Sequence, residues 1–267
     1  MVRGVDIRYD LAGVGAGDGG DLVWGHGLTS SMDAEDELGL FDWAAIRAGH
    51  RVLRYDARGH GASGSTPDPE DLSWRELALD QLALADRVWI GTYVAGGASM
   101  GCATALHAAV TAPERIDGLV LVIPPTAWES RAAQVGAYRL MADLIEAGDH
   151  ETLLAGAAAQ PVPDPFADDP RWADRFPEVL AATDPKRLAR VFRGAATADL
   201  PAPEAIADIS VPALILAWTG DPGHPTRTAA RLQELLPASE LVLAATPSAL
   251  ATWTGRIERF LGRRRSA

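Results

Sequence analysis

The sequence predicts an α/β fold in which a mostly parallel sheet carries helices on both faces. Two observations support this prediction. Short apolar runs of strand type alternate with longer helical patterns up to residue 125, and the alternation resumes near residue 213. Such alternation indicates βαβ units, which build parallel sheets. Between these regions, residues 126–203 are helical in pattern and show no clear strand, which predicts a helical cap inserted into one core domain made of residues 1–125 and 204–267.

The first two expected strands, residues 5–11 and 21–24, flank a glycine-rich turn at residues 13–20. No helix follows this turn, so its backbone amides lack the helix N-terminus that a phosphate-binding loop needs. We interpret it as the turn of a hairpin.

The later elements follow in order along the chain. Leu77, Leu84 and Val88 repeat at helical spacing and predict an amphipathic helix, and Pro113 ends another helix. The further expected strands cover residues 50–55, 89–95, 119–123, 213–218 and 241–245. The expected helices cover residues 41–48, 72–87, 102–112, 226–236 and 252–261.

Composition excludes several classes of function. The chain has 267 residues, 48% of them hydrophobic, which is far too apolar for a disordered protein. Its net charge of −12 disfavours a protein that binds nucleic acid or an anionic membrane surface. Cys102 is the only cysteine, so no intramolecular disulfide forms, and no paired metal ligands stand at useful spacing. We therefore expect a cytoplasmic protein without metal or cofactor; the sequence does not indicate its oligomeric state.

The strongest chemical signal is Gly97-Ala98-Ser99-Met100-Gly101, a G-x-S-x-G sequence between an expected strand and an expected helix. A sharp strand-to-helix turn places the serine hydroxyl at the carboxyl edge of the sheet, and its neighbours must be small. The N–H of Met100, at the start of the helix, points toward a developing oxyanion. The alternative is a serine that only caps a helix.

Two further loops follow expected strands. In Gly25-His26-Gly27-Leu28, the glycines allow a bend beneath a ligand, and the N–H of Leu28 is the candidate second oxyanion donor. We interpret His26 as a structural hydrogen-bonding residue of this oxyanion side. In the second loop, residues 56–63, Asp56 and Arg58 are expected to fix the loop without a direct chemical role.

These three segments, in this order and spacing, resemble the α/β-hydrolase superfamily. The resemblance covers nearly the whole chain and implies an open, mostly parallel sheet of eight strands. It implies Ser99 as nucleophile and the amides of Leu28 and Met100 as oxyanion hole. It also implies an acid after the strand that follows the cap, where Asp221 stands four residues before Pro225. A serine at the turn disfavours dehalogenase-type chemistry, where a carboxylate takes this place.

The chain departs from the superfamily at the base. The resemblance places a histidine after the last strand, yet residues 244–250 contain none, and no histidine follows His224. Three interpretations remain open. His224 supplies the base from the loop of Asp221; His26 or His60 does so; or the base is lost and the protein serves ligand binding or regulation. A serine hydroxyl without a base is a poor nucleophile at neutral pH.

The first hypothesis is therefore a serine hydrolase of a small ester, lactone or thioester. Ser99, Asp221 and His224 are its candidate catalytic residues. The cap is expected to shape a pocket for a small, fairly apolar carbonyl substrate, with Trp128 and Trp218 as candidate walls. The second hypothesis is a member of the same fold that binds or regulates without hydrolysis.

Overall fold

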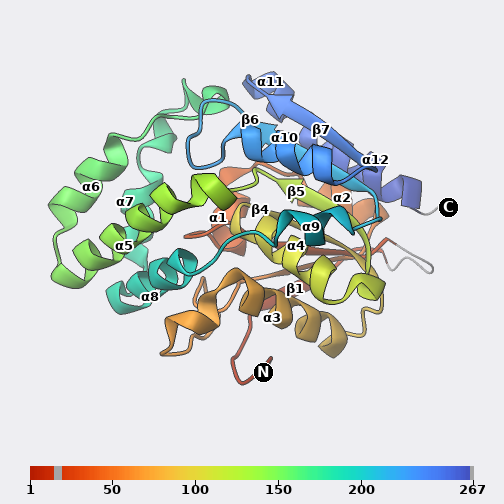
Figure 1. The fold of residues 1–267 in the computed structure, drawn as a ribbon, viewed down its shortest axis with the longest axis horizontal. Helices are drawn as coiled ribbons and strands as arrows, with labels where there is room; N and C mark the ends of the chain where they lie inside the picture. The colour runs from red at the N-terminus through yellow and green to blue at the C-terminus, as the bar shows by residue number, and fades with distance from the viewer. Residues whose placement is uncertain (15–19, 265–267) are drawn as a thin grey trace.

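The structure is a computed structural model that describes residues 1–14 and 20–264 (Figure 1). A central sheet lies between helices on both faces, and a group of helices stands to one side of it. Residues 15–19 of the expected glycine-rich turn lie outside the described residues. The strands are β1 (Tyr9–Ala12), β2 (Leu22–Gly25), β3 (Val52–Tyr55), β4 (Tyr93–Ala98), β5 (Ile116–Val122), β6 (Ala213–Trp218) and β7 (Ser239–Ala244).

The strand order in the sheet is β1-β3-β2-β4-β5-β6-β7. Every neighbouring pair is parallel except β1 and β3, which are antiparallel. The predicted mostly parallel sheet is thus confirmed. Because β2, β4, β5, β6 and β7 run in one direction, the loops that follow them gather at one edge of the sheet.

Two expectations about the sheet are wrong. The described residues contain seven strands, whereas the family resemblance implied eight. Before the first strand, residues 2–5 form a tight turn in which the backbones of Val2 and Val5 bond to each other, and Arg3 and Gly4 have positive φ (42° and 82°). The expected hairpin is absent too, because β3 lies between β1 and β2 in the sheet.

The two faces of the sheet bury alternate residues of the same strands, as the two-residue period of a strand requires. One face packs Val23, Ala95 and Leu121 against the helices α3 (Trp74–Arg87), α4 (Met100–Thr111), α9 (Pro203–Ala207) and α10 (Thr226–Leu235). The other face packs Trp24 and Val94 against α2 (Trp43–Gly49) and α12 (Trp253–Arg264).

One helix near the start of the chain was not expected. Helix α1 (Met32–Leu38) begins after Ser31, whose hydroxyl accepts the N–H of Ala34 at 3.1 Å, and ends at Gly39 with φ 65°. These are ordinary helix caps. Its seven residues are too few to show a clear helical period in the sequence.

Residues 126–203, all described, contain helices and no strand. They form α5 (Arg131–Ala147), α6 (His150–Ala158), α7 (Arg175–Ala182) and α8 (Pro185–Ala196), with the short 3-10 helices η3 (Trp128–Ser130), η4 (Asp164–Phe166) and η5 (Pro170–Trp172). We call this segment the helical insertion. It has an apolar cluster of its own, which includes Ile145, Leu188 and Phe192, and Leu28 of the core packs against that cluster. In Figure 1, α5 to α8 stand beside the sheet.

Within residues 1–14 and 20–264, no helix is both long and apolar enough to cross a membrane.

Candidate active site

Ser99 lies in a strained bend between β4 and α4. Its backbone has φ 52° and ψ −105°, a conformation that costs on the order of 1–3 kcal/mol for a residue with a side chain. The N–H of Ser99 donates to the carbonyl oxygen of Val122 on the neighbouring strand β5 (2.9 Å), which holds the bend in place. The strand–turn–helix context predicted for the G-x-S-x-G sequence is present.

Two glycines allow the bend to approach β2. A Cβ on Gly101 would lie 1.9 Å from the carbonyl oxygen of Gly25, and a Cβ on Gly97 would lie 2.5 Å from the same oxygen. Real Cβ atoms do not come so close to another atom, so any side chain at either position would push β2 away from α4. The motif therefore needs glycine on both sides of Ser99 for steric reasons.

Asp221 and His224 lie on one loop, residues 219–225, between β6 and α10. The Nδ1 atom of His224 lies 2.7 Å from Oδ2 of Asp221, and the Nε2 atom lies 2.7 Å from Oγ of Ser99. A neutral imidazole carries one N–H, so Nδ1–H donates to the carboxylate and Nε2 accepts the serine O–H. The structure thus joins the three predicted residues in one chain of hydrogen bonds.

A turn in the loop explains how side chains only three residues apart can meet. Oδ1 of Asp221 accepts the backbone N–H of Gly223 (2.8 Å) and that of His224 (3.3 Å). These bonds fold the loop back over its own carboxylate, as in an Asx turn. Oδ2 is left facing the imidazole ring.

The surroundings of Asp221 keep it ionised. Burial alone would raise the pKa of this carboxyl, but the hydrogen bond and charge of His224, with the N–H groups of Trp218 and Gly223, outweigh burial and lower its pKa to about 2. An ionised Asp221 is the form that accepts a hydrogen bond from Nδ1–H and favours a positive imidazolium.

The segment after β5 also holds the 219–225 loop. The N–H of Thr126 donates to the carbonyl oxygen of Gly223 (3.1 Å). Since β5 lies between β4 and β6, this bond fixes the loop above the strand that separates Ser99 from Asp221. The side chain of His224 spans the distance between Asp221 and Ser99 and bonds to both.

The loop after β2 reaches Ser99 from the opposite side. A Cβ on Gly27 would lie 3.7 Å from Cβ of Ser99, so this glycine lies against the serine. The N–H of Leu28 donates to no backbone carbonyl among the described residues. Met100 is the first residue of α4, so its N–H has no acceptor within the helix. Both candidate oxyanion donors thus remain available.

His26 holds the loop after β2, and no hydrogen bond joins it to Ser99 among the described residues. Its Nε2 atom accepts the N–H of Ala57 (2.9 Å), and its Nδ1 atom lies 2.7 Å from the carbonyl oxygen of Gly27. Both ring nitrogens are therefore occupied by the backbone, and burial lowers the pKa of His26. These contacts are those of a residue that holds a loop in place.

The loop at residues 56–63 is fixed by its charged side chains. Asp56 accepts the N–H groups of Met32 (2.8 Å) and Ala62 (2.9 Å), while Arg58 pairs with Asp80 at 2.7 Å. His60 is buried beside these residues, and burial lowers its pKa to about 3. Its Nδ1 atom lies 2.9 Å from the carbonyl oxygen of Arg58, so the structure gives neither His60 nor His26 a hydrogen bond to Ser99.

The two candidate tryptophan walls have different surroundings. Trp128 donates from Nε1 to the carbonyl oxygen of Pro201 (3.0 Å), and its backbone N–H contacts the carboxylate of Asp199. None of these bonds reaches Ser99 or His224. Trp218, at the end of β6, donates from Nε1 to Oδ2 of Asp221 at 2.8 Å.

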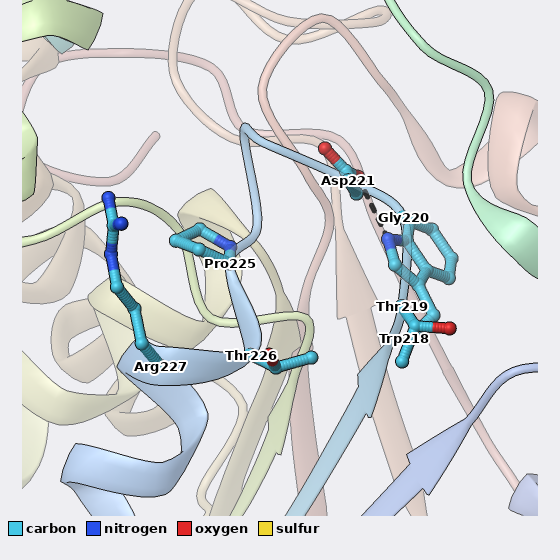
Figure 2. Close-up of a pocket in the computed structure, with 7 residues that line it drawn as sticks. All are labelled: Trp218, Thr219, Gly220, Asp221, Pro225, Thr226 and Arg227. Carbon is cyan, nitrogen blue, oxygen red and sulfur yellow. Dashed lines mark hydrogen bonds between the residues drawn. The ribbon is translucent and has the colours of Figure 1, made fainter.

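Trp218 also lines a cavity of about 290 Å³ beside the acid (Figure 2). The lining residues are Trp218, Thr219, Gly220, Asp221, Pro225, Thr226 and Arg227. The sequence indicated Trp218 as a candidate wall of the substrate pocket but did not predict its hydrogen bond to Asp221. The available signal was its position three residues before the acid, at the last residue of the strand.

The loop after β7 holds no substitute for the missing histidine. The chain passes from Ala244 through Ala245 to Thr246, which caps the short helix α11 (Pro247–Leu250) by accepting the N–H of Ala249 at 3.2 Å. No side chain of residues 245–248 is a base.

Metal binding depends on clustered ligand side chains, and thiol chemistry depends on the surroundings of the one cysteine, Cys102. No group of three or more His, Cys, Asp or Glu side chains in the described part of the chain is arranged to hold a metal ion. Cys102 is fully buried, and burial raises the pKa of its thiol, as expected for a core residue.

Comparisons with known proteins cover almost the same span as the sheet and its helices. The family model described as alpha/beta hydrolase fold matches residues 22–254. The chain is also similar to 3-oxoadipate enol-lactonase 2 of Acinetobacter baylyi, with 26% identity over 222 residues that cover 81% of this chain and 77% of the relative.

Solved structures give the same result for the fold. The enol-lactonase of Burkholderia xenovorans superimposes with a TM-score of 0.77 at 23% identity, covering 98% of this chain and 96% of the other. A hydrolase of Pseudomonas aeruginosa superimposes with a TM-score of 0.77 at 26% identity, covering 96% and 94%.

Proposed function

The chain belongs to the alpha/beta hydrolase fold family, and from that premise we propose that it is a serine hydrolase that cleaves a small ester, lactone or thioester through an acyl-enzyme on Ser99. The observation that carries the proposal is the chain of two 2.7 Å contacts from Ser99 Oγ through His224 to Asp221. It supports a competent base on the loop of the acid, in place of a histidine after the last strand.

In the proposed first step, Oγ of Ser99 attacks the substrate carbonyl carbon while Nε2 of His224 takes the hydroxyl proton. Asp221 keeps the proton of the neutral ring on Nδ1 and stabilises the imidazolium that forms. His224 then gives its proton to the leaving oxygen or sulfur as that bond breaks. A water activated by the same ring attacks the acyl-enzyme and releases the acid, and the proton returns to Ser99.

The proposed oxyanion donors are the N–H groups of Leu28 and Met100. Met100 begins α4, a helix of 12 residues, so its N–H adds the partial positive charge of the helix N-terminus. Leu28 follows Gly27, which lies against Ser99 on the side away from His224. Preorganised donors of this kind stabilise the tetrahedral intermediate more than the planar substrate, which is why they increase the rate.

The relatives support a carboxylic ester or lactone as substrate. An enol-lactonase is similar to this chain over most of its length. The helical insertion, residues 126–203, is the proposed cap, because its apolar cluster packs against Leu28 next to the proposed oxyanion loop. The apolar side chains there suit a small substrate of modest polarity, and the proposed mechanism uses no metal or cofactor.

The test is hydrolysis of p-nitrophenyl acetate and butyrate, with the acyl-enzyme trapped by rapid acid quenching. We expect turnover, a mass increase of one acyl group on the peptide containing Ser99, and neither in Ser99→Ala. Absence of turnover together with absence of the adduct would favour a binding or regulatory protein instead. Turnover retained in Ser99→Ala would exclude the acyl-enzyme on this residue.

A further inference from the structure

The carboxylate of Asp221 receives a hydrogen bond from a side chain outside its own loop. Trp218, the last residue of β6, donates from Nε1 to Oδ2 of Asp221 at 2.8 Å, and Figure 2 shows the indole N–H directed at the carboxylate. His224 Nδ1 approaches the same oxygen at 2.7 Å. The indole and the imidazole therefore converge on one oxygen atom.

The remaining bonds to the carboxylate come from the loop itself. Oδ1 accepts the backbone N–H groups of Gly223 and His224. The carboxylate of Asp221 is thus bonded mainly to its own loop, whose backbone is held from outside by the bond from Thr126 N–H to the carbonyl oxygen of Gly223. Among the described residues, Trp218 is the one side chain that bonds the carboxylate to the sheet.

Trp218 is itself held firmly by aromatic side chains. Its ring stacks on Trp253 of α12, with centroids 6.2 Å apart and planes 12° from parallel, and meets the edge of Phe166 at 5.3 Å. Phe166 stacks in turn on Trp172 at 4.5 Å. Phe166 and Trp172 belong to the helical insertion, whereas Trp253 belongs to the core, so both parts of the chain fix the indole.

The insertion is also bonded to the backbone beside Trp218. The N–H of Asp164 donates to the carbonyl oxygen of Thr219 (3.0 Å), and the hydroxyl of Thr219 donates to Oδ2 of Asp164 (2.5 Å). Gly220 has φ 80°, and a Cβ there would lie 2.4 Å from a carboxylate oxygen of Asp164. The first residues after β6 therefore have little freedom to move.

We propose that Trp218 is a positioning residue of this site, which fixes Asp221, and through it His224, relative to Ser99. The inference rests on the proposed function. Its physical reason is the short separation of acid and base. Asp221 and His224 lie on one loop, so the bond between them does not by itself fix either side chain relative to Ser99. The bond from Trp218, at the end of β6, adds that constraint.

A merely structural role for Trp218 makes a different prediction, and the chain offers a matched control. Trp253 lies in the same aromatic stack, is fully buried, and its Nε1 atom has no hydrogen-bond partner among the described residues. Trp218→Phe and Trp253→Phe each remove one indole N–H and some aromatic area. Only the first removes a bond to the carboxylate.

The experiment measures kcat and KM for p-nitrophenyl butyrate in wild type and both variants, with thermal unfolding of each. A hydrogen bond to a charged acceptor is strong enough that Trp218→Phe should lower kcat by about 10- to 100-fold, while KM stays within about twofold. Trp253→Phe should keep kcat within about threefold at a similar loss of thermal stability. Trp218→His, which restores a ring N–H, should recover part of the lost kcat.

A second measurement does not depend on turnover. The Nδ1 proton of His224 should give a protected NMR signal in wild type and in Trp253→Phe, and a broadened, faster-exchanging one in Trp218→Phe. Equal kcat losses in the two phenylalanine variants, with the His224 proton unchanged in both, would overturn the positioning role and leave the proposed function intact. A wild-type protein that neither hydrolyses the ester nor forms an adduct on Ser99 would overturn both.

Discussion

Two loops at the carboxyl edge of the sheet differ in what they carry. The loop after β6 holds both a carboxylate and an imidazole, bonded to each other and to Ser99. The loop after β7, where the family resemblance places the histidine, carries only alanine, threonine, proline and serine side chains. The difference teaches that geometry at the sheet edge, more than position in the sequence, decides which residue can reach the nucleophile.

The largest expected effect follows from removing the imidazole on the β6 loop. His224→Ala should lower kcat/KM for p-nitrophenyl esters by roughly 10⁴-fold or more, because it removes the one side chain, among the residues that the structure describes, that is bonded to the hydroxyl of Ser99. The matched control is His150→Ala, an exposed histidine at the start of α6, which should leave activity within about twofold. Full activity in His224→Ala would show that another residue acts as the base.

The next effect concerns the acid on the same loop. Asp221→Asn should lower kcat by about 10³- to 10⁴-fold, because an amide NH₂ facing Nδ1 favours the imidazole tautomer whose Nε2 carries the proton. Steady-state kinetics and a circular dichroism spectrum of the variant check this. A loss of less than tenfold in a folded variant would show that Asp221 does not orient His224.

The sequence allowed the bend at Ser99 to be predicted, because its requirements are local. A serine between small residues, at a strand end and a helix start, has few other conformations. The pairing of β1 with β3 was beyond prediction, because it joins segments about 40 residues apart, and the pattern of either strand is compatible with other partners. The eighth strand was implied by the family resemblance alone, because the residue pattern itself indicated only seven strands.

The candidate base was only partly predictable. Because no histidine follows residue 224, the sequence makes His224 a candidate base. The sequence does not show that its ring reaches Ser99. That reach depends on Thr126, which holds the carbonyl of Gly223, and on Trp218, which holds Asp221. Because Thr126 lies nearly 100 residues earlier, its contribution depends on the folded sheet.

A smaller effect concerns pH and the β6 loop. The pKa of Asp221 lies at about 2 in the folded protein, below its ordinary value of 3.8. A lowered pKa contributes stability above the unfolded value, and this stability is lost as pH falls through the folded value. Wild type should therefore lose part of its unfolding free energy between about pH 4 and pH 2, and Asp221→Asn should lose less over the same interval. Urea unfolding at each pH measures both slopes; equal slopes would contradict the assignment.

The smallest effect belongs to the β7 loop. Thr246→Ala removes the cap of α11 and should lower the unfolding free energy by about 1 kcal/mol. Activity at 25 °C should remain within about twofold of wild type, because this loop supplies no catalytic group in our account. A large loss of kcat without loss of stability would show that the β7 loop does take part.

The most direct test of the central claim is the rate at which a fluorophosphonate labels Ser99. Labelling requires an activated serine but no particular substrate, so it reports on the base independently of the pocket. We predict rapid labelling of wild type, none of Ser99→Ala, and labelling of His224→Ala slowed by roughly 10³-fold or more. Equal labelling rates in wild type and His224→Ala would contradict the claim that the β6 loop supplies the base.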